Sequence, residues 1–277
     1  MRVNKWHTRL VRTIPYLPFL LLSVLLLGVW EAAVGSGRVP DFILPAPTAI
    51  ARALYEDRGL LFGVHLAATL HEVFTGLLLS VVLGVLLGVG MYESRRLRQA
   101  VYPLIVINQT LPLIALSPVF VLWFGYTLWS KVAIVFLTAF FPVVVGVYDG
   151  LRAGGTAYDD LLKTMGATRR QRLLHVRIPL ALPSFFSGLK LAGVYSVIGA
   201  TVGEWLGGTE GLGLYSRRMA GNLHTDSMFA AVVLLSAIGL MLFLLFSLLE
   251  RLLPGTRKRK KQPELTTLQT KGDALHD

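Results

Sequence analysis

Six long stretches with almost no charged residues constrain this chain more than any other feature of its sequence. Five contain no Asp, Glu, Lys or Arg over the roughly 17–25 residues that a helix needs to cross a bilayer. The sixth contains one charged residue, Lys190. The stretches are Ile14–Trp30, Phe74–Met91, Val101–Tyr126, Val132–Tyr148, Leu180–Gly203 and Met228–Leu249. We therefore expect an all-α, polytopic membrane protein with six transmembrane helices.

The composition agrees with a chain that lies mostly in the membrane. Charged residues make up 16% of 277 positions, whereas soluble domains contain about 25%. We expect a basic N-terminus over 1–13, one six-span membrane domain over 14–253 and a basic, disordered tail over 254–277. Six spans leave little chain for a separate soluble domain.

The basic residues fall mainly on one side of the predicted spans. Alternate loops place 20 Lys and Arg on one side and 6 on the other. Because cytoplasmic loops are rich in these residues, we expect both termini and the loop 150–179 to be cytoplasmic. The net charge of +11 then reflects topology and the lipid bilayer, and we expect no nucleic-acid partner. A cleaved signal peptide is the rival interpretation of the first span, since small residues follow it at Ala32–Ser36.

Small residues recur at every fourth position in two spans, so each span has a face without bulk. We expect these faces to pack closely against other helices. The first stripe is Gly76, Ser80, Gly84 and Gly88. The second is Ser184, Gly188, Ala192, Ser196 and Ala200, and its next step is Glu204.

The chain lacks the motifs of common enzyme classes. It has no Gly-x-x-x-x-Gly-Lys-Ser/Thr phosphate loop, no His-Glu-x-x-His and no Gly-x-Ser-x-Gly. It has no cysteine, and its six histidines are scattered. We therefore predict no catalytic residues, no metal site and no cofactor in this chain.

Polar residues within the spans are candidates for a solute path, because such groups are costly in the membrane unless they face a cavity or each other. The third predicted span also contains Pro103, Pro112 and Pro118, which favour a bent helix that lines a cavity. The candidates are Asn108, Gln109, Thr110, Ser196, Thr201 and Glu204. The alternatives are helix-to-helix hydrogen bonding for Asn108 and Gln109 and an interfacial position for Glu204. We expect Glu72 to be solvated at a span end.

The loop 150–179 is polar and rich in arginine, and one glycine interrupts its helical pattern. We predict a short helix up to Met165, a left-handed turn at Gly166, and a second helix over Ala167–Val176 that Pro179 ends. Two short helices joined by a glycine form a protruding elbow. The alternative is an ordinary basic cytoplasmic loop.

The spacing in this loop resembles the EAA loop of permease subunits of bacterial ATP-binding-cassette (ABC) importers. Val176 follows Gly166 by ten positions, and Ile178 and Pro179 come next. The resemblance implies that the elbow inserts into a groove of a separate ATPase subunit. The residues it assigns to this contact are Asp160, Leu161, Leu162, Gly166, Ala167, Val176, Ile178 and Pro179. Leu161 and Leu162 depart from the two alanines usual in that family.

Further motifs resemble the permease branch that serves nitrate, alkanesulfonate, taurine and thiamine-precursor importers. They are Leu44-Pro45-Ala46-Pro47, Leu111-Pro112-Leu113-Ile114-Ala115-Leu116-Ser117-Pro118, Phe140-Phe141-Pro142, Gly203-Glu204-Trp205-Leu206 and Gly211-Leu212-Gly213. The resemblance implies a type I ABC importer permease fold in the bacterial inner membrane. It also implies two ABC ATPase subunits that bind the ATP, a second, identical permease and an extracytoplasmic solute-binding protein.

The resemblance favours one substrate and leaves others open. The run Tyr195–Trp205 is most similar to the hydroxymethylpyrimidine members of that branch, and alkanesulfonate, taurine and nitrate are the alternatives. The rival classes are a channel or ion-coupled secondary transporter and a membrane-embedded enzyme. A secondary transporter is expected to have paired intramembrane carboxylates or two homologous halves, and neither is evident in the sequence.

Overall fold

A computed structural model describes residues 17–153 and 161–253, and every regular element in these ranges is helical. The all-α prediction is therefore confirmed. The basic N-terminus over 1–13 and the tail over 254–277 lie outside the described residues. The elements are α2 (Leu17–Gly35), α3 (Pro47–Glu56), α4 (Arg58–Leu60), η1 (Leu61–His65), α5 (Leu66–Glu93), α6 (Arg95–Thr110), α7 (Leu113–Phe124), α8 (Leu128–Arg152), α10 (Arg169–Arg172), η2 (Leu173–Arg177), α11 (Ile178–Gly207), α12 (Leu212–Gly221) and α13 (Thr225–Leu252).

Five helical runs in the described ranges are long and apolar enough to cross a membrane. They extend the predicted stretches at one or both ends, because the helices continue past the first charged residue into the polar boundary. The runs are Leu17–Gly35, Arg58–Glu93, Leu128–Arg152, Arg169–Gly207 and Thr225–Leu252.

The remaining predicted span is broken into α6 and α7, whose axes differ by 106°. The break lies at Leu111 and Pro112. A residue before proline is driven out of the α-helical region, and Leu111 has the extended angles φ −77° and ψ 128°. Since α6 begins where α5 ends and α8 begins at the opposite end of the bundle, the bent pair carries the chain between the two ends. It serves as the sixth span.

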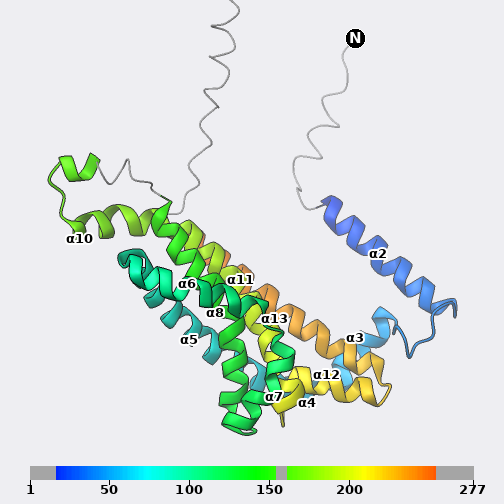
Figure 1. Cartoon of the computed structure of the whole chain (residues 1–277). Helices are drawn as coiled ribbons and strands as arrows, with labels where there is room; N and C mark the ends of the chain where they lie inside the picture. Colours follow the sequence, from blue (N-terminus) through cyan, green and yellow to red (C-terminus); the bar gives the residue numbers. More distant parts are fainter. Residues whose placement is uncertain (1–16, 154–160, 254–277) are drawn as a thin grey trace, which may run out of the picture.

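Helix α8 lies at the centre of the bundle, between α5 and α11 (Figure 1). The two small-residue stripes pack against it, as predicted. A Cβ atom added to Gly84 would lie 2.8 Å from Val143 Cγ1, and one added to Gly88 would lie 2.8 Å from Val147 Cβ. On the other side of α8, a Cβ at Gly188 would collide with the carbonyl oxygen of Pro142. The stripes therefore set the closest helix approaches in the core.

The bundle has two distinct ends. At one end α10 and η2 project beyond the other helices, and at the other end α12, α4 and α7 gather (Figure 1). Glu72 and Glu93 mark these ends on α5, and 21 residues of helix separate them by about 30 Å, which matches the hydrocarbon thickness of a bilayer. We call the first end the elbow end and the second the α12 end.

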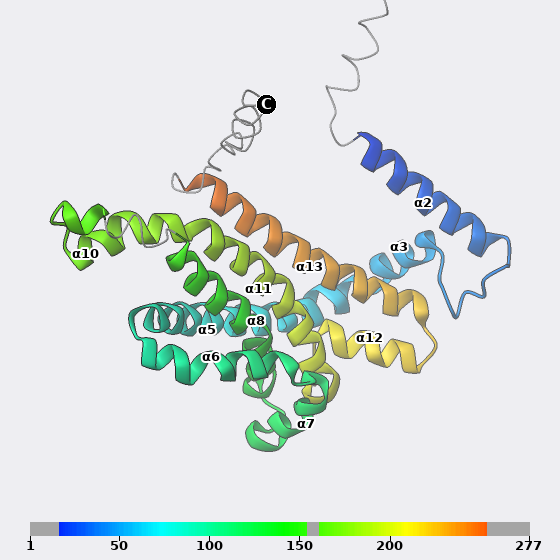
Figure 2. The same ribbon diagram turned by 45° about the horizontal axis from the view of Figure 1, so that its top comes forward.

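Helix α2 stands apart from the bundle in both views (Figures 1 and 2). Only 6% of its most apolar 18-residue stretch is buried inside the structure. Its contacts lie near its C-terminal end, where Trp30 packs edge-on against Phe229 and Glu31 accepts a hydrogen bond from Thr48 Oγ1 at 2.6 Å. An apolar helix exposed on this scale requires a lipid or protein environment.

Candidate functional site

The elbow begins with a helical turn that ends at Gly166. The N–H of Ala167 donates to Leu162 O at 3.0 Å, and the N–H of Gly166 donates to Lys163 O at 3.0 Å. These two bonds form a Schellman motif, which needs a left-handed residue after the helix. Gly166 has φ +78°, so the predicted glycine turn is present.

The second helix of the elbow starts with a capping box. Thr168 Oγ1 accepts the N–H of Gln171 at 3.3 Å, and Gln171 Oε1 accepts the N–H of Thr168 at 2.9 Å. The prediction that Pro179 ends this helix is wrong, since the helical run continues to Gly207. A π-helical turn over Leu173–Arg177 leads into α11, and Pro179 occupies one of the first positions of α11. The missing N–H of proline costs little there.

The residues that the resemblance assigned to the ATPase contact lie on the elbow. Asp160 is outside the described residues. Leu161 and Ile178 are 58% and 39% exposed, and the neighbouring Met165 is 73% exposed. Gly166 is also exposed, whereas Leu162, Ala167, Val176 and Pro179 are half-buried. The elbow thus presents apolar side chains outward together with Arg169 and Arg170.

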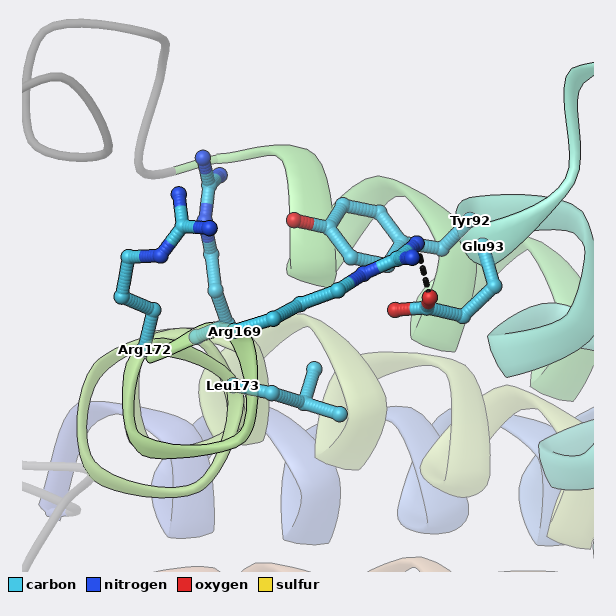
Figure 3. A pocket seen from close by; sticks show the side chains of 6 residues that line it. Tyr92, Glu93, Arg169, Arg172 and Leu173 are labelled. Atoms are coloured by element: carbon cyan, nitrogen blue, oxygen red, sulfur yellow. Dashed lines mark ion pairs between the residues drawn. The ribbon is translucent and has the colours of Figure 1, made fainter. Parts of the chain in front are cut away.

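Two arginines tie the elbow to the ends of α5 and α8. Arg169 pairs with Glu93 at the end of α5 (Figure 3). Arg177 is buried, and its Nη1 donates to the carbonyl oxygen of Leu151 at 3.0 Å. Its guanidinium also lies 5.8 Å from the centre of the Tyr92 ring. The elbow is therefore fixed to the bundle on two sides.

A buried ionic cluster lies at the α12 end, on three different helices. It comprises Glu72 of α5, Lys131 of α8 and Glu204 of α11, which are 1%, 7% and 0% exposed. Lys131 Nζ pairs with Glu72 Oε1. Glu204 Oε1 accepts a hydrogen bond from Thr69 Oγ1 at 2.6 Å. Partnered charges of this kind hold the three helices together, because separating them would leave a charge buried alone.

The same cluster holds the loop between α11 and α12. The N–H of Gly213 donates to Glu204 Oε2, and the N–H of Leu212 donates to Thr69 Oγ1 at 2.9 Å. Gly211 has φ +125°, and a Cβ there would collide with the Glu204 carboxylate. The Gly-Leu-Gly motif thus lets the backbone close over Glu204.

We expected Glu72 to be solvated, and Lys131 is one of the six basic residues that we assigned to loops on the less basic side; both expectations are wrong. Each residue belongs to the first turns of a long helix and is buried among the helices, where Lys131 pairs with Glu72 and packs against Gly203 of α11. The partners are 59 residues apart in the chain, so neither stretch alone shows the pairing. The burial of Glu204 could be predicted, because Glu204 continues the stripe of small residues on the buried face of α11. The cluster also brings two carboxylates, Glu72 and Glu204, together near the α12 end, a pairing that was not evident in the sequence.

The candidate path residues contact different neighbours within one chain. Asn108 Nδ2 donates to Leu137 O of α8 at 3.1 Å, which is the helix-to-helix alternative, while Gln109 and Thr110 are exposed on α6. Ser196 is fully buried and donates to Gly193 O. Thr201 lines a groove of about 370 Å³ between α11 and α13. Glu204 belongs to the ionic cluster and is not exposed at an interface.

Known proteins resemble this chain over most of its length. The family described as "Binding-protein-dependent transport system inner membrane component" matches residues 80–255. The formylaminopyrimidine transport permease protein ThiX of Halalkalibacterium halodurans is 45% identical over 246 residues, which cover 89% of this chain and 96% of that protein. The riboflavin transport system permease protein RibX of Chloroflexus aurantiacus is 35% identical over 241 residues, covering 86% and 90%.

A solved structure shares the fold. A chain of the MetNI methionine ABC transporter, in inward-facing conformations, matches with a TM-score of 0.60 and 21% identity, over 71% of this chain and 97% of that chain. The type I importer permease fold is thereby confirmed. The family match, the relatives and the fold agree with the branch that the motifs indicated. The chain belongs to the binding-protein-dependent transport system inner membrane components, which are permease subunits of ABC importers.

Proposed function

We propose that this permease forms the solute path of an ATP-driven importer and is coupled to a separate ATPase through its elbow. The observation that carries this proposal is the projecting, outward-facing elbow at residues 161–178. It exposes Leu161, Met165 and Ile178, although it is firmly fixed to α5 and α8. Exposed apolar side chains on a rigid projection favour a protein partner.

The described contacts support a mechanical role for the elbow. The helical run Arg169–Gly207 extends from the elbow to the buried cluster at the α12 end. Arg177 links this run to α8, and Glu204 links its far end to α5 through Thr69. A displacement of the elbow therefore moves α11 as a rigid element and acts on both ends of the bundle. ATP-driven closure of the ATPases would in this way alternate the access of the path.

The charge distribution supports an orientation with the elbow end in the cytoplasm. The loops 92–100 and 150–179 at that end contain nine Lys and Arg, against six on the other side, and the alternation of six spans then places both termini on the elbow side. We propose two ABC ATPase subunits at the elbow end, a second, identical copy of this permease and an extracytoplasmic solute-binding protein at the α12 end. The ATP belongs to the partner subunit, and this chain needs no catalytic residue, metal or cofactor of its own.

The substrate that the similarities favour is an aminopyrimidine. The run Tyr195–Trp205 resembles hydroxymethylpyrimidine permeases, and the relative that is 45% identical is named for formylaminopyrimidine. Alkanesulfonates, taurine and nitrate are the alternatives. Among the candidate path residues, Gln109 and Thr110 are the first that we assign to the lining of the path, because both side chains are exposed on α6.

The experiment is uptake of labelled 4-amino-5-hydroxymethyl-2-methylpyrimidine and of a formylaminopyrimidine by cells with and without this gene, before and after ATP depletion. We expect uptake that needs both the gene and ATP. Gene-dependent uptake of taurine, an alkanesulfonate or nitrate instead would replace the substrate and keep the mechanism. Uptake that survives ATP depletion but collapses with the ion gradient would identify an ion-coupled transporter.

A further inference from the structure

Two arginines at the elbow end converge on one tyrosine hydroxyl. Tyr148 of α8 is 3% exposed. Its oxygen accepts hydrogen bonds from Arg98 Nη1 at 3.0 Å and from Arg152 Nη1 at 3.1 Å. The Arg152 guanidinium also lies 5.3 Å from the centre of the Tyr148 ring. Two positive groups are thus held close together by a neutral oxygen.

Among the described residues, neither arginine of this arrangement has an ion-pair partner. The neighbouring Arg169, by contrast, pairs with Glu93 (Figure 3). The Tyr148 hydroxyl already accepts two bonds, and among the described residues its own proton has no acceptor. Three hydrogen-bond donors therefore meet with no carboxylate of the described ranges bonded to them, and the two like charges repel each other.

Two hollows flank the Tyr148 hydroxyl, with volumes of about 200 and 350 Å³. Both are lined by Arg98, Tyr148 and Arg152; the smaller also contains Arg95, and the larger contains Asp149. Three arginines against one aspartate leave a net charge of +2 around the hydroxyl. Guanidinium groups bind phosphate oxygens with paired, charge-assisted hydrogen bonds.

We propose that Arg98, Arg152 and Tyr148 bind a phosphate-type oxyanion, and that the source is the headgroup of an anionic phospholipid. The position of the cluster favours a lipid over a free ion. It lies where α5, α6 and α8 reach the elbow end, at the boundary between apolar spans and basic loops. Basic pockets between membrane helices on that side bind anionic headgroups.

The surface next to the cluster suits the acyl chains. Beyond Arg98, α6 exposes Tyr102 and Val106, which are 38% and 42% exposed and follow Arg98 at four-residue spacing on one face of the helix. An apolar strip therefore continues from the hollows towards the middle of the bundle. A phospholipid would place its phosphate against the arginines and its chains along this strip of α6.

The test is titration of the purified full-length chain, in a neutral detergent, with phosphatidylglycerol and with phosphatidylcholine, with bound lipid counted by native mass spectrometry. We expect Arg98→Gln/Arg152→Gln to bind phosphatidylglycerol about tenfold more weakly than the wild type and Tyr148→Phe about threefold more weakly. Binding of phosphatidylcholine should not change. The matched control is Arg96→Gln/Arg251→Gln, which removes two exposed charges at the same end outside the hollows.

Competition with inorganic phosphate distinguishes the sources. If millimolar phosphate leaves bound phosphatidylglycerol in place, the lipid headgroup is the ligand. If phosphate binds to the wild type and the lipid does not, the oxyanion site is supported with a free ion as its source. The proposal is overturned if the double variant binds both ligands as the wild type does, or if the control loses as much. It is also overturned if the double variant binds the lipid normally and loses only its association with the ATPase subunit.

Discussion

Glu204 is the residue on which the α12 end of the bundle is built. Its two carboxylate oxygens accept hydrogen bonds from Thr69 of α5 and from the N–H of Gly213 at the start of α12, and Lys131 lies against Gly203, the residue before Glu204. The sequence singled out Glu204 through its polar character and its place on a small-residue stripe. It did not reveal Glu72 and Lys131, because their burial depends on contacts between helices that are far apart in the chain.

The glycine that closes over Glu204 should be intolerant of any side chain. Gly211→Ala would place a Cβ against the carboxylate in a left-handed conformation, and we expect a loss of about 2–4 kcal/mol in the free energy of unfolding. The measurement is the thermal unfolding midpoint of the purified protein. The control is Gly221→Ala in α12, where no atom lies within 4 Å of the new Cβ. Equal midpoints for the two variants would contradict this role of Gly211.

Lys131 should stabilise the fold mainly through its positive charge, and less through the packing of its aliphatic side chain. Lys131→Met leaves the Glu72 and Glu204 carboxylates buried without a cation, and we expect a loss of about 3–5 kcal/mol in stability. Adding Glu72→Gln removes one of these charges and should recover part of that loss. Thermal unfolding midpoints of the single and double variants measure the recovery. A double variant less stable than Lys131→Met would show that the charges do not couple in this way.

At the scale of helices, the glycines that allow close packing and the glycine that forms a turn could be predicted from the sequence, whereas the π-helical turn could not. The four-residue spacing of small residues in α5 and α11 predicted close packing, and both stripes meet α8. Gly166 was predicted as a left-handed turn from its place between two helical patterns. The π-helical turn before Pro179 was missed, because local rules treat proline as a helix end and do not register a change in hydrogen-bond spacing.

The helix seams should show a graded response to added methyl groups. In Gly188→Ala the Cβ meets the backbone carbonyl of Pro142, which cannot move aside, whereas in Gly84→Ala it meets the side chain of Val143. We expect losses of about 3 kcal/mol and about 1 kcal/mol, respectively. Gly28→Ala in α2 has no atom within 4 Å of the Cβ and should be neutral. Thermal unfolding of the three variants gives the order, and a reversed order would refute the proposed packing of α8 and α11.

Helix α12 is also held by Tyr215, whose hydroxyl donates to Asp57 Oδ2 at 2.6 Å. Burial, together with this bond, raises the pKa of Tyr215 to about 12. Tyr215→Phe should cost about 1 kcal/mol at neutral pH. Because the folded pKa lies above the unfolded value of about 10, the wild-type advantage should be complete below pH 10 and disappear between pH 10 and 12. Chemical unfolding across this range measures it, with the exposed Tyr55→Phe as control. An advantage that does not change with pH would contradict the assignment.

At the scale of the whole molecule, the permease consists of two anchored ends and a continuous helix between them. The number of spans, the central position of the glycine seams and the existence of the elbow follow from periodicity and composition, which act locally. The 106° bend between α6 and α7 and the isolation of α2 depend on neighbours that a single sequence does not show. The path residues from α6 and α11 contact different neighbours within one chain, as expected if the second copy that we propose completes the passage.

The coupling role of the elbow is tested most directly by comparing two glycines with similar backbone angles. Gly166 has φ +78° and Gly37 has φ +70°, and neither has an atom within 4 Å of an added Cβ. Gly166→Asp and Gly37→Asp therefore carry similar local costs of about 1 kcal/mol, at opposite ends of the molecule.

The measurement is ATP-driven solute uptake into liposomes that contain the permease, its ATPase and its binding protein. We predict that Gly166→Asp abolishes uptake while the protein still inserts into the membrane, and that Gly37→Asp retains it. Full uptake by Gly166→Asp would contradict the assignment of the elbow as the contact with the ATPase.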